Sequence, residues 1–291
     1  MNINTRVNLM FPPEKNLVYN NFVMIKDKYM KKIQMTLLTA LTFLMMCSAS
    51  WAATYYIDGT NGNDTKSGSQ SAPWKTIGKA NSTLRAGDTV YIKKGTYKQT
   101  IRPSRSGEKG SYITYARNGN DEVIITGVSD GVNLVNRKYV IIDGLKILNV
   151  SGEWVDMRPN GCHNIIMNCY MKNAGSYKGI QIRDGANYNK ILNNTLIGEC
   201  SPADLIQVWN SSHNLIDGND CYYGPHDTIS VRGIDKSYSN KYNIIRNNYV
   251  YNKWHSCINI RGVEFILCEN NIVVDGGDSY KTSPCGTSRD K

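Results

Sequence analysis

The most constraining feature of this sequence is a short phrase that recurs about every 25 residues from residue 140 onward. Each copy places two short β-prone runs on either side of Asn or Gly, residues that tolerate the left-handed backbone of a tight bend. A period of this length indicates a repeat architecture. The first core-facing residues of the copies are Ile142, Ile166, Ile191, Ile216, Ile245 and Cys268, at spacings of 24, 25, 25, 29 and 23 residues.

A second phrase lies between successive copies of the first and alternates aliphatic and polar residues with a period of two, which is typical of a strand with one buried face. Three short strands per repeat, with no helical segment between them, leave no room for the crossover of a βαβ unit. We therefore predict an all-β fold, a right-handed parallel β-helix in which each repeat is one rung of a single solenoid. The second phrase spans residues 155–158, 180–183, 206–209, 229–232 and 258–261.

The segment before residue 140 fits the start of such a solenoid. Apolar residues at Trp74, Ile77, Ala80 and Leu84 predict a short amphipathic helix that caps the N-terminal end of the β-helix. We assign residues 53–139 to this cap and the first rung, 140–277 to the β-helix rungs, and 278–291 to a polar tail. Because solenoids need covered ends and this tail offers no cap, we interpret the sequence as truncated.

The first 52 residues have the pattern of a leader and signal peptide. Lys31 and Lys32 precede an apolar run over residues 35–46, and Ser50-Trp51-Ala52 offers small residues for cleavage. A dozen apolar residues are too few for a bilayer anchor, which takes about 20. We expect no membrane span in the mature chain, and a secreted, periplasmic or cell-surface location.

The net charge favours an acidic partner. The chain has 34 Lys and Arg against 24 Asp and Glu, a formal charge of +10, and removal of residues 1–52 reduces it to +6. A hydrophobic content of 41% excludes intrinsic disorder. Beyond Cys47 in the leader, seven cysteines lack paired C-x-x-C spacing, so we expect no zinc site and favour buried thiols over disulfides.

In a β-helix, residues at equivalent positions of successive rungs stack on one another and form a row along the surface, here called a column. One column carries guanidinium groups and an indole, and the column two residues earlier carries amides and a carboxylate. Guanidinium groups match carboxylates bidentately and an indole can stack on a sugar, so this face suits an acidic polysaccharide. A solvated polar face is the alternative. The predicted substrate-binding residues are Arg158, Arg183, Gln181, Gln207, Trp209 and Asn259.

Two histidines and two arginines form the candidate catalytic site. His226 and His255 are 29 residues apart, as are Arg232 and Arg261, so the two pairs should stack on adjacent rungs. An imidazole can move a proton near neutral pH. Neighbouring guanidinium groups can neutralise a uronate carboxylate and the charge that forms when its C5 proton leaves. This arrangement predicts β-elimination or C5 epimerisation of an acidic sugar.

Other polar residues are assigned smaller roles. Lys178 and Glu153 lie beside the arginine column and are candidates for a base or metal ligand, while His163 and His213 are read as turn residues. The loop over residues 58–64 lacks EF-hand spacing. We identify no metal-ligand set, and calcium stays open. A stacked hydrogen-bonding ladder is expected at the bend formed by Asn168, Asn193, Asn247 and Asn270.

The opening of the repeat region resembles that of a known family. Residues 55–59, 72–77, 86–92 and 95–97 are similar to the start of secreted right-handed parallel β-helix proteins, which include pectate, alginate and chondroitin lyases. The resemblance covers residues 54–277. It implies a polysaccharide lyase, and family lyases often use calcium with a Lys or Arg base, although the sequence offers no clear acidic cluster.

A second, local resemblance concerns the candidate catalytic site. Pro225-His226-Asp227, with His255 and Arg261, is similar to the Asp-Pro-His-Asp motif and following Arg of mannuronan C5-epimerases, with Gly224 in place of the first Asp. The leading hypothesis is a uronate polysaccharide lyase. A C5-epimerase, a glycoside hydrolase and a non-catalytic carbohydrate-binding solenoid remain alternatives. Nucleic acid is not expected as a partner, and a capped full-length solenoid is expected to be a monomer.

Overall fold

The computed structural model describes residues 28–36, 52–175, 178–198, 204–233, 240–252 and 255–274. The chain divides into two units, Met1–Ser50 and Trp51–Lys291, and the second contains every described strand. In the first unit, residues 28–36 are helical. Among the described residues, no helix is long and apolar enough to cross a bilayer. The predicted apolar run beyond residue 36, Ser50 and Trp51 of the predicted cleavage site, and the tail over 278–291 lie outside the described residues.

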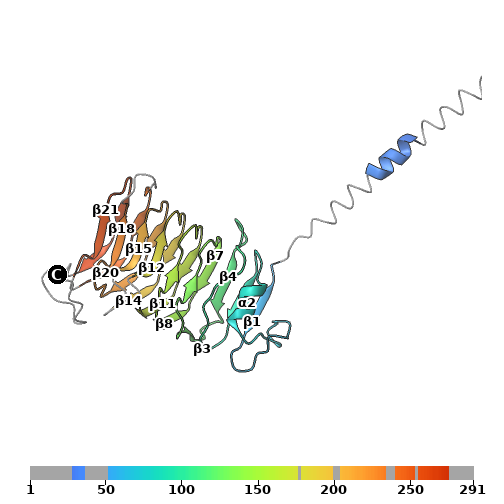
Figure 1. Cartoon of the computed structure of the whole chain (residues 1–291), viewed down its shortest axis with the longest axis horizontal. Coiled ribbons are helices and arrows are strands. Elements are labelled where there is room, and N and C mark those ends of the chain that lie inside the picture. The colour runs from blue at the N-terminus through green and yellow to red at the C-terminus, as the bar shows by residue number, and fades with distance from the viewer. Residues whose placement is uncertain are drawn as a thin grey trace, which may run out of the picture. The chain divides into compact units, whose positions relative to one another are not determined.

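The second unit is a right-handed parallel β-helix, as the repeat predicted. Figure 1 shows successive strands stacked along the solenoid from β1 to β21. The described strands form three parallel sheets, and each sheet takes one strand per rung. The first sheet has nine strands: β1 (Thr54–Ile57), β2 (Thr89–Ile92), β4 (Ile113–Arg117), β7 (Val140–Asp143), β10 (Ile165–Met167), β13 (Lys190–Leu192), β16 (Leu215–Asp217), β19 (Ile244–Arg246) and β22 (Leu267–Glu269).

The second and third sheets complete each rung, and the third carries the candidate site. The second contains β3 (Gly95–Tyr97), β5 (Val123–Ile125), β8 (Lys146–Val150), β11 (Tyr170–Ala174), β14 (Thr195–Ile197), β17 (Asp220–Tyr222), β20 (Tyr249–Tyr251) and β23 (Ile272–Val274). The third contains β6 (Val132–Asn133), β9 (Val155–Asp156), β12 (Lys178–Arg183), β15 (Asp204–Trp209), β18 (Ile229–Arg232) and β21 (Ile258–Arg261).

The N-terminal cap is a short helix, α2 (Ile77–Thr83), as predicted. The hydroxyl of Thr76 accepts a hydrogen bond from the Lys79 amide and so caps the first turn. Ile77 and Ala80 are fully buried against the first rungs. The segment over residues 53–139 differs from the expectation of a single rung, because strands β1 to β6 already stack through more than one turn there.

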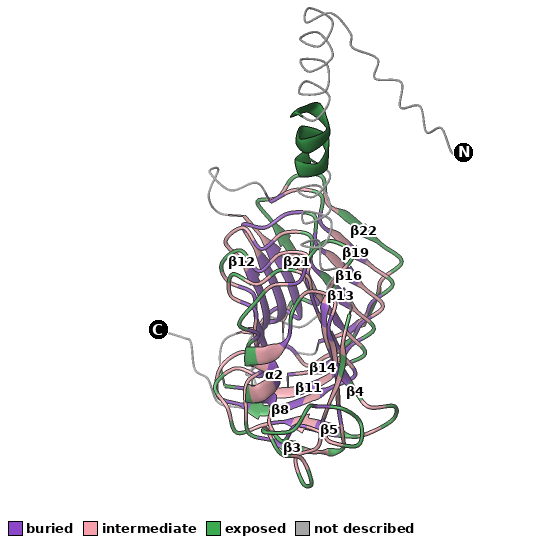
Figure 2. Cartoon of the chain, turned by 90° about the vertical axis from the view of Figure 1, so that its right-hand side faces the viewer, coloured by how far each residue is buried: buried purple, intermediate pink, exposed green. Residues whose placement is uncertain are grey.

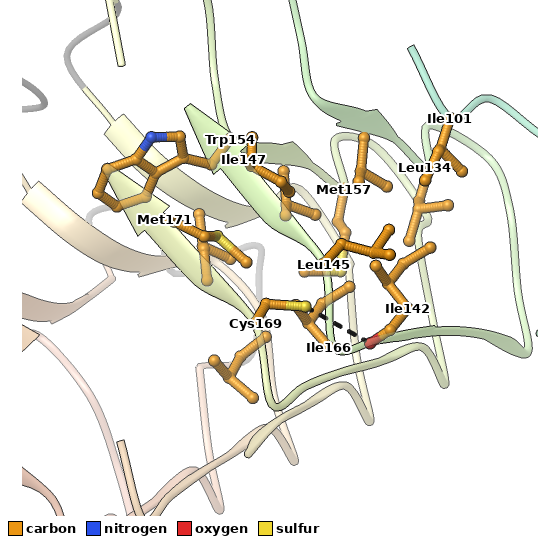
Figure 3. Close-up of a cluster of buried hydrophobic side chains, with 14 of the residues drawn as sticks. Ile101, Leu134, Ile142, Leu145, Ile147, Trp154, Met157, Ile166, Cys169 and Met171 are labelled. Carbon is orange, nitrogen blue, oxygen red and sulfur yellow. Dashed lines mark hydrogen bonds between the residues drawn. The ribbon is translucent and has the colours of Figure 1, made fainter. Parts of the chain in front are cut away.

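The interior is filled by aliphatic side chains from all three sheets. Figure 3 shows one section of this core, where the Cys169 thiol lies 3.9 Å from the Ile142 carbonyl oxygen. Cys169 and Cys221 are buried free thiols, as predicted, and Cys257 is also buried, whereas Cys162 is half-buried and Cys268 is exposed. Burial raises the pKa of Cys169 to about 12, so this thiol is unreactive at neutral pH. The remaining cysteines, Cys47, Cys200 and Cys285, lie outside the described residues.

The asparagine ladder lies one residue beyond the predicted column. Asn168, Asn193, Asn247 and Asn270 adopt left-handed backbone at the bend, as expected for their role there. The buried ladder is formed by the next residue from Asn194 onward: the Asn194 amide donates to Asn219 Oδ1, and the Asn219 amide donates to Asn248 Oδ1, both at 2.9 Å. The side chain that follows the bend turns inward, where its amide must find partners.

The predicted turn residues His163 and His213 belong to a second ladder. Both have left-handed backbone, and their rings stack between tyrosines of adjacent rungs at centroid distances of 4.6 to 5.1 Å. Stacking covers the ring faces, so these histidines contribute to rung packing. The ladder runs through Tyr139, His163, Tyr188, His213, Tyr242 and Phe265.

Candidate functional site

The candidate site lies on the outer face of the third sheet. Its inward residues, such as Ile180 and Val208, belong to the core, and the polar residues between them lie on the opposite face. The predicted register is confirmed, because Arg183 pairs with Trp209, Trp209 with Arg232, and Arg232 with Arg261. Arg158 follows β9, one rung before β12, and extends the same column.

This face is much less exposed than the sequence suggested. Gln181 is 4% exposed and Gln207 and Ser230 are 0% exposed, and Figure 2 shows the strands around β12 as buried. These side chains point outward, and Gln207 and Ser230 both donate hydrogen bonds to the buried Asp204 carboxylate. Gln181 and Gln207 are therefore too buried to contact a polymer directly, whereas Trp209, Asn259 and Arg261 have accessible surface.

Asp204 is the centre of the polar network. Its carboxylate is fully buried, and the amides of Leu205 and Ile206 both donate to the Thr228 carbonyl, which marks a local irregularity in β15. Asp204 Oδ2 accepts hydrogen bonds from Lys178 Nζ at 2.6 Å, Ser230 Oγ at 2.9 Å and Gln207 Nε2 at 3.0 Å. The carboxylate is thus saturated by donors from three adjacent strands.

The Asp204 carboxylate also orients His226. His226 Nδ1 lies 3.1 Å from Asp204 Oδ1 and 3.2 Å from Asp227 Oδ2. Ionised carboxylates only accept hydrogen bonds, so Nδ1 is the nitrogen that carries a proton in this pair, and Nε2 is the ring nitrogen left for other partners. Burial by itself would raise the pKa of Asp204, but hydrogen bonds from His226, Lys178 and Ser230 and the Lys178 charge hold it below its ordinary value.

The two predicted histidines meet, as their common 29-residue spacing indicated. The rings of His226 and His255 stack with centroids 4.6 Å apart. Burial, and next the charge of His226, lower the pKa of His255, so its ring is neutral at neutral pH. Trp254, which precedes His255, lies outside the described residues.

Three of the four predicted guanidinium groups lie within ion-pair distance of a carboxylate, and the contact between Arg183 Nε and Asp184 Oδ2, at 4.0 Å, is the loosest. Arg232 forms an ion pair with buried Asp227, whose Oδ2 also accepts from Asn259 Nδ2 at 3.0 Å. Arg158 donates to Asp156 at 2.9 and 3.1 Å and to Glu153 at 3.1 Å. The column is therefore not a row of free cations, because local carboxylates balance part of its charge.

Arg183 and Arg261 lie differently. Arg183 sits over the Trp209 ring, with its guanidinium carbon 4.9 Å from the ring centroid, a cation–π contact. Arg261, at the C-terminal end of the column, is exposed. A planar platform and an exposed cation thus lie on the same ladder, and both are suited to a carboxylated sugar.

A carboxylate cluster that the sequence did not reveal lies at the N-terminal end of this face. Oxygen atoms of Asp130, Glu153 and Asp156 lie within 4.8 Å of one another. Burial raises the pKa of Glu153, Arg158 opposes this, and the charges of Asp156 and Asp130 reinforce it. The 23-residue spacing between Asp130 and Glu153 matches the repeat, so aligning the rung before residue 140 would have found the pair.

Comparisons with known proteins agree with this fold. A family model described as "Pel9A-like, right handed beta helix region" matches residues 55–218. The chain is 32% identical over 109 residues to the uncharacterized protein YwoF of Bacillus subtilis (strain 168), covering 34% of this chain and 23% of YwoF. This chain therefore spans less than a quarter of that relative.

Solved structures with the same fold include three lyases. Pectate lyase Pel9A matches with a TM-score of 0.59 and 21% identity, over 70% of this chain and 55% of that one. A rhamnogalacturonan lyase matches with a TM-score of 0.57 and 18% identity, over 78% of this chain and 62% of that one. The alginate lyase from Paenibacillus sp. str. FPU-7 matches with a TM-score of 0.50 and 18% identity, over 78% of this chain and 97% of that one. With the rung architecture and the family match over residues 55–218, this chain belongs to the Pel9A-like right-handed β-helix family.

Proposed function

We propose that this chain acts on an acidic, uronate-containing polysaccharide and cleaves it by β-elimination on the outer face of the third sheet. The observation that carries the proposal is the pairing of fully buried Asp204 with the Nδ1 of partly exposed His226. A buried carboxylate that fixes the tautomer of an accessible imidazole is a common arrangement for a general base. The names of the structural neighbours, three of which are polysaccharide lyases, support the substrate class.

The proposed reaction begins at the carbon beside the uronate carboxylate. His226 Nε2 takes the C5 proton, and the electron pair left on C5 forms the C4–C5 double bond as the C4–O4 bond breaks. The leaving O4 takes up a proton. The products are a new chain end and a 4,5-unsaturated uronate, and no oxidant or reductant is required. Asp204 and Asp227 stabilise the imidazolium that forms. Lys178 helps to hold the pKa of Asp204 low, and Arg232 forms an ion pair with Asp227.

Substrate binding is assigned to the accessible members of the column. Exposed Arg261 lies one rung from His226 and is suited to neutralise the reacting carboxylate, which favours loss of the neighbouring proton. The stacked Arg183 and Trp209 offer a platform for another sugar ring. Arg232 acts mainly on Asp227, so its role is to position the carboxylate rather than to bind the polymer.

Calcium fits the carboxylate cluster at the other end of this face. Asp130, Glu153 and Asp156 supply the hard oxygen ligands that calcium prefers, and the raised pKa of Glu153 reflects burial and crowded negative charge that a cation would relieve. These residues would hold the ion, which would supply positive charge for a uronate carboxylate. Because β9 and β18 are three rungs apart, about 14 Å at ~4.8 Å per rung, that carboxylate belongs to a different sugar from the reacting one.

The carboxylate geometry weighs against a glycoside hydrolase. Such enzymes need a pair of accessible carboxyl groups beside the scissile bond. Asp156, Asp204 and Asp227 are buried and paired with Arg158, Lys178 and Arg232, respectively. The stacked imidazoles of His226 and His255 instead favour C5 epimerisation as the second candidate, because the ring beside the base can return a proton.

We also propose that the chain is exported and meets its polysaccharide outside the cytoplasm, on the basis of the leader pattern in residues 1–52. No role in nucleic-acid binding is proposed. A fusion of residues 1–52 to a reporter enzyme that is active only after export tests this placement directly. Export of the reporter, and its loss when Lys31 and Lys32 are replaced by Glu, are the expected results; retention in the cytoplasm would contradict the proposal.

The test of activity is incubation with pectate, alginate and chondroitin while the ultraviolet absorbance of the unsaturated product is followed. A lyase raises the absorbance. C5 exchange of deuterium from solvent without a rise in absorbance indicates an epimerase. His226→Gln should abolish turnover while polymer binding is retained, and His213→Asn, in the aromatic ladder, serves as the matched control. Binding without turnover or exchange on any polymer would establish a carbohydrate-binding solenoid instead.

A further inference from the structure

Three potential metal ligands gather where β18 and β21 begin. His226, Asp227 and His255 each offer one ligand atom, and these atoms lie within 4.8 Å of one another. The two imidazoles stack with centroids 4.6 Å apart, which holds the two rings side by side at the start of adjacent rungs. Two histidine nitrogens and one carboxylate oxygen form a donor set that recurs in sites for zinc and related divalent ions.

Asp227 has an oxygen that its own neighbours leave unused. Asp227 is 1% exposed. Its Oδ2 forms an ion pair with Arg232, lies 3.2 Å from His226 Nδ1 and accepts a hydrogen bond from Asn259 Nδ2. Its Oδ1 is buried and has no hydrogen-bond partner among the residues that the structure describes. A buried carboxylate oxygen without a donor is costly, since the group loses water without a replacement. A cation at this oxygen would satisfy it.

The surroundings of His226 are those of a metal-ligating histidine. Ligating imidazoles usually donate their other ring nitrogen to a carboxylate, which fixes the ring and strengthens its ligand nitrogen. His226 Nδ1 lies 3.1 Å from fully buried Asp204, and Asp204 is in turn held by Lys178 and Ser230. This arrangement presents Nε2 as a ligand with its supporting shell already built.

We propose that His226, His255 and Asp227 form a binding site for a divalent transition metal ion, with zinc as the expected occupant. Imidazole ligands favour such ions over calcium and magnesium, which prefer oxygen. The present spacing of up to 4.8 Å exceeds the ~3.3 Å between tetrahedral ligands with bonds of ~2.1 Å, so the side chains close around the ion on binding. A water or a substrate oxygen completes the coordination.

The metal site has a direct consequence for the proposed reaction, and this consequence alone rests on the proposed function. A zinc ion on His226 Nε2 occupies the lone pair that would remove the C5 proton. Zinc should therefore inhibit β-elimination, whereas calcium should not. Metal binding itself needs no turnover, so it can be measured even if the enzymatic proposal fails.

The histidine content makes the experiment clean. The chain has four histidines, and the other two, His163 and His213, are stacked in the aromatic ladder. Zn²⁺ is titrated into the metal-free protein by calorimetry, and Co²⁺ is used as a coloured substitute. One ion should bind per chain, with visible Co²⁺ absorption and no thiolate charge-transfer band. His255→Asn should weaken Zn²⁺ binding at least ~10-fold, and Asp204→Asn should weaken it about 10- to 100-fold through the supporting shell.

The control and the refuting results follow from the same titration. His213→Asn, which suits the left-handed backbone at that position, should leave Zn²⁺ binding unchanged. Circular dichroism verifies that each variant is folded. If His255→Asn does not fold, His226→Asn serves as the second variant that removes a ligand. Absence of stoichiometric binding, equal loss in His213→Asn, or a thiolate band that places the ion on a cysteine would overturn the proposal.

Discussion

Replacing Asp204 with Asn should destabilise the protein strongly. Asp204 is 0% exposed and pairs with Lys178, whose side chain is 17% exposed, and it also accepts from Ser230, Gln207 and His226. Removing one member of a buried ion pair costs about 3 to 5 kcal/mol, because the partner charge stays behind. Asn keeps one acceptor oxygen but turns an NH₂ group toward these donors, so a loss of about 3 kcal/mol is expected.

Urea unfolding followed by circular dichroism measures this loss. With an m-value of about 2 to 3 kcal/mol/M, the midpoint should fall by roughly 1 to 1.5 M without a change in slope. Asp220→Asn, on the exposed face of β17, is the matched control and should stay within about 0.5 kcal/mol of the parent chain. Adding Lys178→Met to Asp204→Asn should recover part of the loss, since it removes the stranded charge.

The reasoning is refuted if Asp204→Asn costs under about 1 kcal/mol, or no more than Asp220→Asn does. Either result would mean that Asp204 is hydrated or that Lys178 has left the pair. A double variant that costs the sum of the two single variants would separately show that the two side chains are not coupled.

Three other changes test the ladders, the cap and the binding face. Asn219→Ala should cost about 1 to 3 kcal/mol in urea unfolding, because it leaves buried amide partners unsatisfied on both neighbouring rungs. Burial acts to raise the pKa of Asp64, but hydrogen bonds from the Thr76 hydroxyl and two backbone amides lower this pKa overall. Asp64→Asn should therefore destabilise the chain at neutral pH. Thermal melting scans should show the difference between the two proteins fading as pH falls below about 3.8. Trp209→Ala should weaken polymer binding about 5-fold or more in affinity electrophoresis, since the Arg183 platform is lost; unchanged migration would remove Trp209 from the binding face.

Much of the site's layout was predictable from rung spacing. The common 29-residue interval placed His226 near His255 and Arg232 beside Arg261, because parallel pairing in a solenoid aligns residues one repeat apart. The sequence placed Glu153 beside the arginine column, but it did not predict the ion pairs that the arginines form. Asp227 forms an ion pair with Arg232, five residues away, and Glu153 forms one with Arg158 at the same separation. Both pairs depend on side-chain conformations, which the repeat pattern of the sequence does not specify.

The sequence by itself determined the right-handed β-helix, its rung period after residue 140 and its capping helix. These follow from period, alternation and bend residues, which act within one rung or between equivalent positions of adjacent rungs. Tertiary structure decided which polar side chains are buried, which arginines remain available, and that Asp130 joins Glu153 and Asp156 in a cluster. The physical reason is that burial and ion pairing depend on contacts between different columns. Those contacts are set by local irregularities, such as the one after Asp204, and by side-chain packing rather than by the repeat.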